Sequence, residues 1–188
     1  CRDLGWPEPT EAQARYVIGI ELRQALRLVV PGLPEDAIPP LAEAYRRHYL
    51  AGEADLRLFP GIAELIRDLH ARGVRIAVAT GKRRPGLERA LAAADLAACF
   101  DATRCADDCP SKPNPRMIEE LRAQLSAPRE TTLMVGDTTH DLQMAKNAGV
   151  AALAAAYGAH PRAELERLEP LAAADTPAQL ALWLKRHV

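Results

Sequence analysis

The sequence carries no excess of charge of either sign. Over 188 residues, Lys and Arg number 24 and Asp and Glu number 25, which gives a formal net charge of −1. A protein that binds a nucleic-acid duplex normally presents a basic stripe, so this balance argues against such a partner. The chain also lacks an apolar run long enough to cross a bilayer and opens with no signal-peptide pattern. We therefore expect a soluble, cytoplasmic protein with no membrane partner.

Cysteine is scarce, and its spacing excludes a common kind of metal site. The four cysteines are Cys1, Cys99, Cys105 and Cys109. Zinc favours two close CxxC-type pairs, which these positions do not provide, so we expect reduced and partly buried thiols. The first residue is Cys rather than Met, and we expect the encoded protein to begin upstream of it.

Apolar residues are abundant, and the first third of the chain is predicted to be helical. The hydrophobic fraction is 48% and the charged fraction 26%, enough for one compact α/β domain with a small appendage. Residues 1–58 show only helical spacing, with one helix capped by Thr10 and a second from about Glu35. In the first helix, Ile18, Leu22, Ala25 and Val29 recur at helical spacing. In the second, Leu41, Ala44, Tyr45 and His48 lie on one face. A linker is expected around Gly52–Arg57.

From Phe59 onward, short apolar segments alternate with amphipathic helices. Strands are predicted at 74–80, 99–105, 131–137 and 150–156, and helices near 62–69, 87–94, 117–125 (capped by Asn114), 139–148 (closed by Gly149), 162–168 and 177–185. This alternation predicts parallel βαβ units, and hence a doubly wound α/β domain with a Rossmann-like parallel sheet over residues 59–188. Such strands are expected to be buried on both faces. Ligands of these sheets bind beyond the carboxyl ends of the strands, which draws attention to three loops.

Two of these loops offer groups that suit a phosphate. Thr80-Gly81-Lys82 ends a strand, and its hydroxyl and backbone N–H groups can grip phosphate oxygens; the alternative is an ordinary glycine turn. In CPSKPNPRM, prolines on both sides stiffen the approach to Lys112, so its ammonium has a fixed direction suited to a phosphoryl dianion. The alternative for Lys112 is a solvated surface lysine.

The third loop places two aspartates at a strand-to-helix junction. Asp137 ends a buried strand, and Asp141 lies in the first turn of the following helix, which Thr138 and Thr139 can cap. Oxygen ligands at a site that also takes phosphate predict Mg²⁺ rather than a softer ion. The structural alternative is an aspartate favoured by the helix dipole. His140 lacks a partner histidine at metal spacing and is expected to be exposed.

The order of these loops resembles a known family. Thr at the end of one strand, Lys-Pro before a helix and Gly-Asp-Thr-x-x-Asp at the next strand end are similar to motifs of the haloacid-dehalogenase-like hydrolase superfamily. VATGKRRPGLERAL, SKPNPRM and MVGDTTHDLQMAKNAGV resemble its phosphoglycolate-phosphatase-like branch. The similarity runs from Phe59 to the end of the chain. The helical residues 1–58 resemble that branch's cap domain.

The resemblance implies roles for the matching residues. Thr80 would bind the transferring phosphoryl group, and Lys112 would neutralise it. Asp137 would ligate Mg²⁺, and Asp141 would orient that metal site or Lys112. The implied substrate is a small phosphorylated metabolite.

Residues beside these motifs receive weaker assignments. Gly81 and Lys82 would border the phosphate, and Lys82 would reach toward the substrate. Arg15 and Gly19 fall on a predicted cap helix that could meet the substrate, although Arg15 is better explained as a surface arginine.

The sequence departs from the family at its first motif. An Asp-x-Asp on an initial strand would supply the nucleophile and the general acid, and the printed chain has none. Asp3 and the Asp107-Asp108 pair have the wrong surroundings or spacing. The expected place of the missing strand is between those ending at Thr80 and Asp137. We therefore expect another strand to fill that gap or the sheet to be rearranged.

The function predicted by the resemblance is a Mg²⁺-dependent phosphatase that acts through an aspartyl-phosphate intermediate. Alternatives within the superfamily are a sugar-phosphate mutase and a carbon–halogen hydrolase, of which the latter needs no Mg²⁺. A further alternative is a truncated or inactive binding module that only holds Mg²⁺ and an anion.

Overall fold

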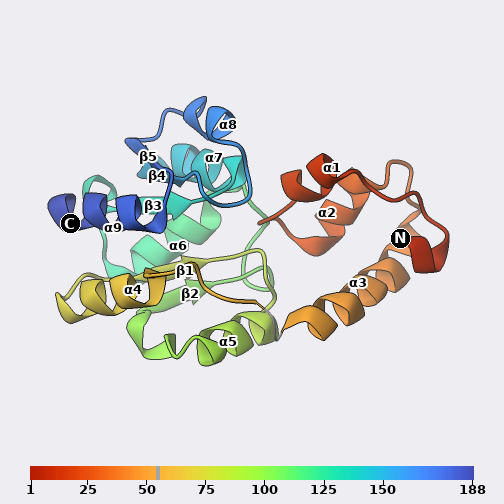
Figure 1. Cartoon of the computed structure of the whole chain (residues 1–188), viewed down its shortest axis with the longest axis horizontal. Helices are drawn as coiled ribbons and strands as arrows, with labels where there is room; N and C mark the ends of the chain where they lie inside the picture. The colour runs from red at the N-terminus through yellow and green to blue at the C-terminus, as the bar shows by residue number, and fades with distance from the viewer. Residues whose placement is uncertain (54–55) are drawn as a thin grey trace.

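The computed structural model describes residues 1–53 and 56–188 and confirms an α/β fold (Figure 1). Parallel strands alternate with helices from residue 62 onward, and the earlier part of the chain is helical. The helices are α1 (Glu11–Tyr16), α2 (Leu22–Val29), α3 (Ile38–Gly52), α4 (Ile62–Ala71), α5 (Arg84–Ala93), α6 (Arg116–Leu125), α7 (Thr139–Ala148), α8 (Arg162–Glu166) and α9 (Pro177–His187).

The strands form two parallel sheets. β1 (Ala77–Ala79) pairs with β2 (Ala102–Arg104). β4 (Ala151–Ala155) lies between β3 (Leu133–Gly136) and β5 (Ala172–Ala174). The alanine-rich β5 was not predicted, because alanine gives little sign of a strand.

The two sheets are separated at the place where the sequence predicts a missing strand. In the part of the chain that the structure describes, β1 and β3 belong to different sheets, so each has an unpaired edge. The whole of β1 is only half-buried, and Val135 in β3 is 37% exposed. The prediction that the strands are buried on both faces is therefore wrong for β1 and β3. Both strands are less buried because no described strand covers the unpaired edge of each.

Helices cover both sides of the sheets (Figure 1). On one side α4 and α9 bury Leu65, Leu69 and Leu180 against Leu153 of β4. On the other side α6 and α7 bury Met117 and other apolar side chains, and α6 packs against both β1 and β2. Ala79 of β1 and Met134 of β3 pack against the same apolar cluster, although the two strands do not pair with each other.

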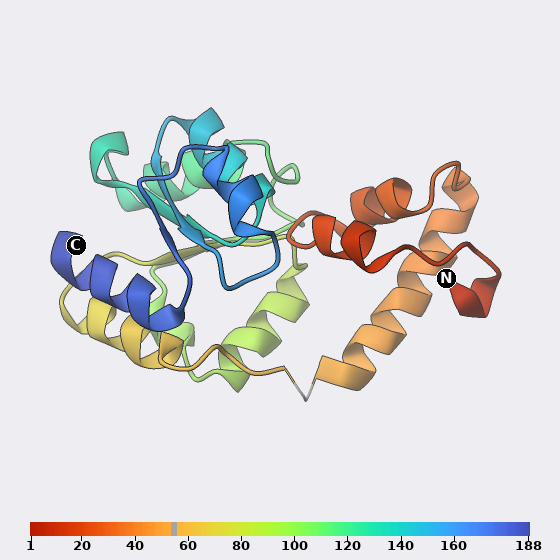
Figure 2. The same ribbon diagram turned by 45° about the horizontal axis from the view of Figure 1, so that its top comes forward.

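Helices α1–α3 form a separate layer with its own apolar core, which stands to one side of the sheets (Figure 2). Thr10 caps α1 as predicted, but the single helix expected through Val29 is wrong. The chain turns at Gly19, whose φ is +93°, and α2 starts after Glu21, which accepts hydrogen bonds from the next backbone N–H groups. α1 itself ends at Tyr16 with Val17 as its C-cap, and the left-handed conformation of the turn at Gly19 favours glycine.

The second predicted helix is confirmed, and the four residues predicted on one face differ in burial. A short 3-10 turn at Glu35–Ala37 leads into α3, where Leu41 and Ala44 are buried but Tyr45 and His48 are exposed. The predicted linker Gly52–Arg57 includes residues 54–55, which lie outside the described residues. The division of the chain at residue 58 stays a prediction.

Several smaller features also differ from prediction. Pro115 rather than Asn114 is the N-cap residue of α6, although the Asn114 side chain accepts a hydrogen bond from the Arg116 N–H. Cys99, Cys105 and Cys109 are free thiols, and all three are buried. Within residues 1–53 and 56–188, no helix has the length and apolar character needed to span a membrane.

Backbone hydrogen exchange tests the interruption of the sheet. The backbone groups of Ile76 and Thr80 form hydrogen bonds on the side of β1 that faces β2. Because successive residues of a strand direct their backbone groups to opposite sides, the Ala79 N–H points toward the gap between the two sheets. We expect the Ala79 amide to exchange well before the amide of Leu153, a residue of the central β4. Equal protection of the two amides, measured by NMR, would show that the edge of β1 is covered.

Candidate active site

A buried ion pair joins two of the predicted loops. Lys112 Nζ lies 2.6 Å from Asp141 Oδ1, and each side chain is only 6% exposed. The interpretation of Lys112 as a solvated surface lysine is therefore wrong. Leaving one member of such a pair buried without its partner costs about 3–5 kcal/mol.

The start of α7 fixes the other carboxylate oxygen of Asp141. Asp141 Oδ2 accepts hydrogen bonds from Thr138 Oγ1 at 2.7 Å and from the Thr138 N–H at 3.2 Å. In return, the Asp141 N–H donates to Thr138 Oγ1, which completes a reciprocal cap. The helix start thus holds Asp141 in place, and Asp141 in turn holds the ammonium of Lys112.

Gly136 allows this arrangement because it has no side chain. A Cβ at Gly136 would lie 2.2 Å from the Cβ of Asp141, closer than any real contact. The end of β3 can therefore pass beside Asp141 only if residue 136 is glycine.

A loop that the sequence analysis did not single out holds Asp137. The Ala159 N–H donates to Asp137 Oδ2 at 2.9 Å, and the His160 N–H donates to the Asp137 carbonyl at 3.0 Å. A Cβ at Gly158 would lie 2.3 Å from that of Asp137. Burial and the nearby charge of Asp137 raise the pKa of Tyr157. In the sequence, only Gly158 after β4 could have indicated that this loop approaches Asp137 closely.

The two aspartates are not equivalent as ligands for a cation. Both oxygens of Asp141 accept hydrogen bonds from Lys112 or Thr138, whereas Asp137 binds Ala159 through Oδ2 alone. Among the described residues, no group of three or more His, Cys, Asp or Glu side chains could hold a metal ion. The role of Asp137 as a ligand of Mg²⁺, an ion that keeps several waters or phosphate oxygens, stays a prediction. The role of Asp141 as a second ligand stays a prediction.

The loop after β1 closes tightly around Thr80. The Lys82 N–H donates to Thr80 Oγ1 at 3.1 Å. A Cβ at Gly81 would lie 2.6 Å from the Gly19 carbonyl oxygen and 2.7 Å from that of Ile20. The backbone of the helical layer therefore rests directly on this loop, and glycine is required there.

All three predicted loops meet one segment, residues 16–21, which we call the cap segment. Besides its contact with Gly81, Gly19 faces Thr138, to which a Cβ at Gly19 would come within 3.4 Å. The Glu21 N–H donates to Ser111 Oγ, next to Lys112, at 2.9 Å. The loops thus converge on a common segment. That Thr80, Lys112 and Asp137 bind one anion stays a prediction.

The cap segment is held by two histidines. The Tyr16 carbonyl oxygen lies 2.7 Å from His140 Nε2 and 3.2 Å from His160 Nε2. Because the Thr139 N–H donates to His160 Nδ1, His160 carries its proton on Nε2 and donates to Tyr16. Burial lowers the pKa of His140. The prediction of an exposed His140 is wrong, because the cap segment covers it.

Of the other residues considered in the sequence, Gly19 is part of this arrangement and the others have partners elsewhere. Gly19 belongs to the cap segment rather than to a helix, and Arg15 is an exposed residue paired with Glu11 at 2.9 Å. Asp3 pairs with His48 at 2.7 Å, and Asp107 pairs with Arg83 at 2.8 Å. Asp108 accepts a hydrogen bond from the Cys105 N–H at 2.9 Å. These acids therefore have other partners, as expected.

Comparison with known proteins decides the family. A family model described as haloacid dehalogenase-like hydrolase matches residues 1–155. The chain belongs to this family. It is 36% identical over 180 residues to a probable phosphatase of Dickeya dadantii, covering 93% of this chain and 78% of that protein. It is 31% identical over 189 residues to a phosphoglycolate phosphatase of Vibrio vulnificus, covering 95% of this chain and 82% of that protein.

A solved protein structure has the same fold as this chain. A hydrolase from Pseudomonas syringae superposes with a TM-score of 0.85 at 21% identity, covering 94% of this chain and 82% of that one. At this identity the likeness concerns the fold alone. The doubly wound architecture predicted from the sequence is thereby confirmed.

Substitution of Gly136 tests how closely β3 approaches Asp141. Gly136→Ala should displace Asp141 from Lys112 and lower the free energy of unfolding by about 3–5 kcal/mol, measured by urea denaturation. Gly52→Ala is the matched control, because a Cβ at Gly52 meets nothing within 4 Å. A Gly136→Ala protein as stable as the control would contradict the close approach.

Proposed function

We propose that this chain is a phosphatase that hydrolyses a small, phosphoglycolate-like phosphate monoester with the help of Mg²⁺. The observation that carries the proposal is the buried Lys112–Asp141 pair, beside loops that suit phosphate. Asp141 braces this ammonium, so little reorganisation is needed when negative charge builds on the phosphoryl oxygens. The named phosphatases among the relatives support the same chemistry.

Each residue of the site has a proposed task. Lys112 neutralises the transferring phosphoryl group, and Asp141 fixes the direction of Lys112. The Thr80 hydroxyl and the N–H groups after it bind phosphoryl oxygens. Asp137 would hold Mg²⁺, which when bound supplies positive charge that stabilises the transferring group.

The nucleophile in this proposal is a carboxylate on a strand that pairs between β1 and β3. The unpaired edges, the half-buried β1 and the exposed Val135 support a place for one strand there. Its carboxyl end would lie beside Thr80 and Asp137. The carboxylate oxygen would attack phosphorus, and the bond from phosphorus to the alcohol oxygen would break as an acid protonates that oxygen. Water would then hydrolyse the aspartyl phosphate to phosphate and restore the carboxylate.

The cap segment would control access to this site. Its backbone rests on Gly81 and faces Thr138, so an ester can enter only when the segment moves away. Reclosure would exclude water from the phosphoryl group during attack.

The interrupted sheet favours a second candidate, a non-catalytic module that binds Mg²⁺ and an anion. Phosphate release separates the two candidates. For a protein that also carries the proposed nucleophile strand, we expect Mg²⁺-dependent release of phosphate from small phosphate esters, and loss of release when the metal is chelated. Binding of esters without any release would favour the module.

Removal of the Lys112 charge tests the residue that carries the proposal. Lys112→Met should lower the rate of phosphate release by about 100-fold or more, because one stabilising cation is lost. Lys146→Met is the control, since Lys146 is an exposed lysine that pairs with Glu169 at 3.3 Å. Equal rates in the two variants would exclude Lys112 from the chemistry.

Substitution of Asp137 tests the proposed metal ligand. Asp137→Asn keeps the shape of the side chain and an acceptor for the Ala159 N–H but removes the charge that Mg²⁺ requires. We expect phosphate release to fall by orders of magnitude while circular dichroism stays unchanged. Asp175→Asn, at an exposed partner of Arg162, serves as control. Full activity of Asp137→Asn at low Mg²⁺ would refute the assignment.

A further inference from the structure

His160 is a buried histidine that lies between the start of α7 and the cap segment. Only 2% of its surface is exposed, and both nitrogens of its ring have partners. Nδ1 accepts a hydrogen bond from the Thr139 N–H at 3.0 Å, and Nε2 donates to the Tyr16 carbonyl oxygen at 3.2 Å. The imidazole therefore connects an element of the core with the segment that covers the site.

The side chain of Tyr16 adds a second contact between the cap segment and this histidine. The rings of Tyr16 and His160 are stacked, with centroids 5.8 Å apart and an angle of 13° between their planes. The His140 ring meets the His160 ring edge-on at 5.3 Å. If the cap segment moves away, the His160 ring thus loses its hydrogen-bond acceptor and its stacking partner together.

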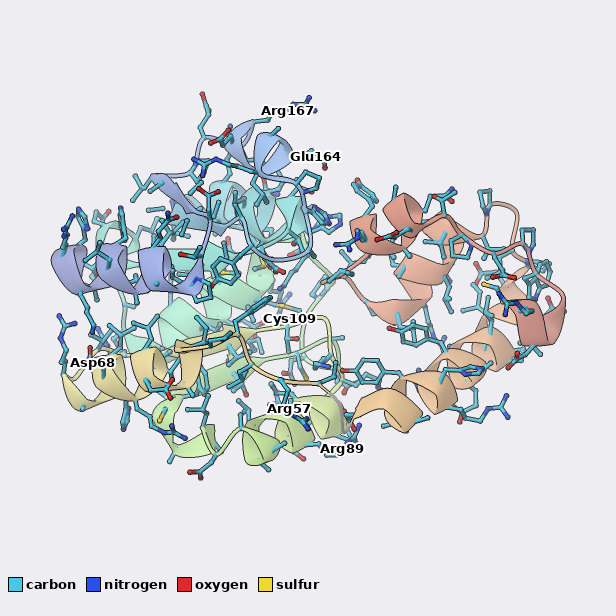
Figure 3. The ribbon with its side chains drawn as sticks, viewed as in Figure 1. Arg57, Asp68, Arg89, Cys109, Glu164 and Arg167 are labelled. Carbon is cyan, nitrogen blue, oxygen red and sulfur yellow. The ribbon has the colours of Figure 1, made fainter. Side chains whose placement is uncertain are left out.

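The backbone around His160 holds Asp137. The His160 N–H donates to the Asp137 carbonyl oxygen at 3.0 Å, and the preceding Ala159 N–H donates to Asp137 Oδ2 at 2.9 Å. This loop leads directly into α8, on which Glu164 is labelled in Figure 3, at the side of the core that faces the helical layer. One short loop therefore contacts Asp137 through its backbone and the cap segment through its imidazole.

We propose that His160 is a positioning residue that transmits the position of the cap segment to Asp137. While the segment is docked, the ring is held at both nitrogens, and the Ala159 N–H keeps the Asp137 carboxylate in one orientation. When the segment moves away to admit an ester, the loop is released on one side and this hydrogen bond weakens. The coupling is reciprocal, so a ligand that fixes Asp137 favours the docked segment.

The consequence of this coupling rests on the proposed function, because that function gives Asp137 a task in the reaction. Closure of the cap segment would then both exclude water and orient the carboxylate. An ester that enters the open site would meet an Asp137 whose orientation is not yet fixed.

Gly81→Ala is expected to displace the cap segment without altering the loop that carries His160. A Cβ at Gly81 would lie 2.6 Å from the Gly19 carbonyl oxygen, so the backbone of the segment must shift. Hydrogen exchange of the Glu21 amide, which donates to Ser111 Oγ, reports this release.

Hydrogen exchange of the Ala159 amide, measured by NMR on the full chain, reports the coupling. We expect this amide to exchange about fivefold faster or more in Gly81→Ala, because its hydrogen bond to Asp137 opens more often. The Leu153 amide in the central β4 should keep its rate. Gly86→Ala is the matched control, since a Cβ at Gly86 meets nothing closer than 3.9 Å.

Two replacements of His160 separate its two hydrogen bonds. His160→Gln places an amide N–H near the position of Nε2 and so retains a donor for Tyr16. His160→Asn retains an acceptor for the Thr139 N–H near the position of Nδ1 but does not reach Tyr16. In the His160→Asn background, Gly81→Ala should no longer change the exchange of Ala159. In the His160→Gln background, part of the change should remain.

Each other outcome overturns the inference in a distinct way. Faster exchange of Glu21 with unchanged exchange of Ala159 would show that the cap segment and Asp137 are independent. An effect of Gly81→Ala that persists in the His160→Asn background would show a connection that bypasses His160. An equal rise in the rate of Leu153 would show a general loss of stability in place of coupling.

A second variant displaces the cap segment from within. Gly19→Ala strains the segment at a residue whose φ is +93°, and it replaces Gly81→Ala if that variant fails to fold or leaves Glu21 protected. Protection of Glu21 in both variants would show that the segment is not held as proposed, and the inference would fail. The measurements need no ester, metal or turnover. Absence of phosphate release would therefore refute the proposed function and leave the coupling intact.

Discussion

The ion pair between Lys112 and Asp141 is the interaction on which the rest of the site depends. Two charges at 2.6 Å, each with a side chain 6% exposed, persist only when further hydrogen bonds satisfy them. Thr138 supplies these bonds to Asp141 through the first turn of α7. The pair therefore ties the loop before α6 to the end of β3.

Close backbone approach is the second constraint, and three glycines permit it. Gly136 lies against Asp141, Gly158 against Asp137, and Gly81 against the carbonyls of the cap segment. Each contact brings a functional loop nearer to its neighbour than any side chain would allow. The same packing leaves the cap segment over the loops, held by His140 and His160, so movement of the helical layer and access to the site are coupled.

Features encoded by neighbouring residues were predictable from the sequence. The bounds of α7 and its end at Gly149, with φ of +66°, follow from spacing and capping within a dozen residues. Burial of Lys112, the covering of His140 and the role of Gly158 depend on residues distant in the chain, and no local pattern contains them. The break at Gly19 lies in a run of apolar residues at helical spacing, so periodicity alone predicted a continuous helix there. The short β5 is made of alanines, which periodicity and propensity do not identify as a strand.

A crystal structure of the chain with bound tungstate, an anion similar in size to phosphate, tests most directly whether the loops form one phosphate site. The account predicts a single anion that accepts hydrogen bonds from both Lys112 Nζ and the Thr80 loop, on the side of Asp137. An anion bound elsewhere, or one that contacts Lys112 while Thr80 points into another region, would contradict the account.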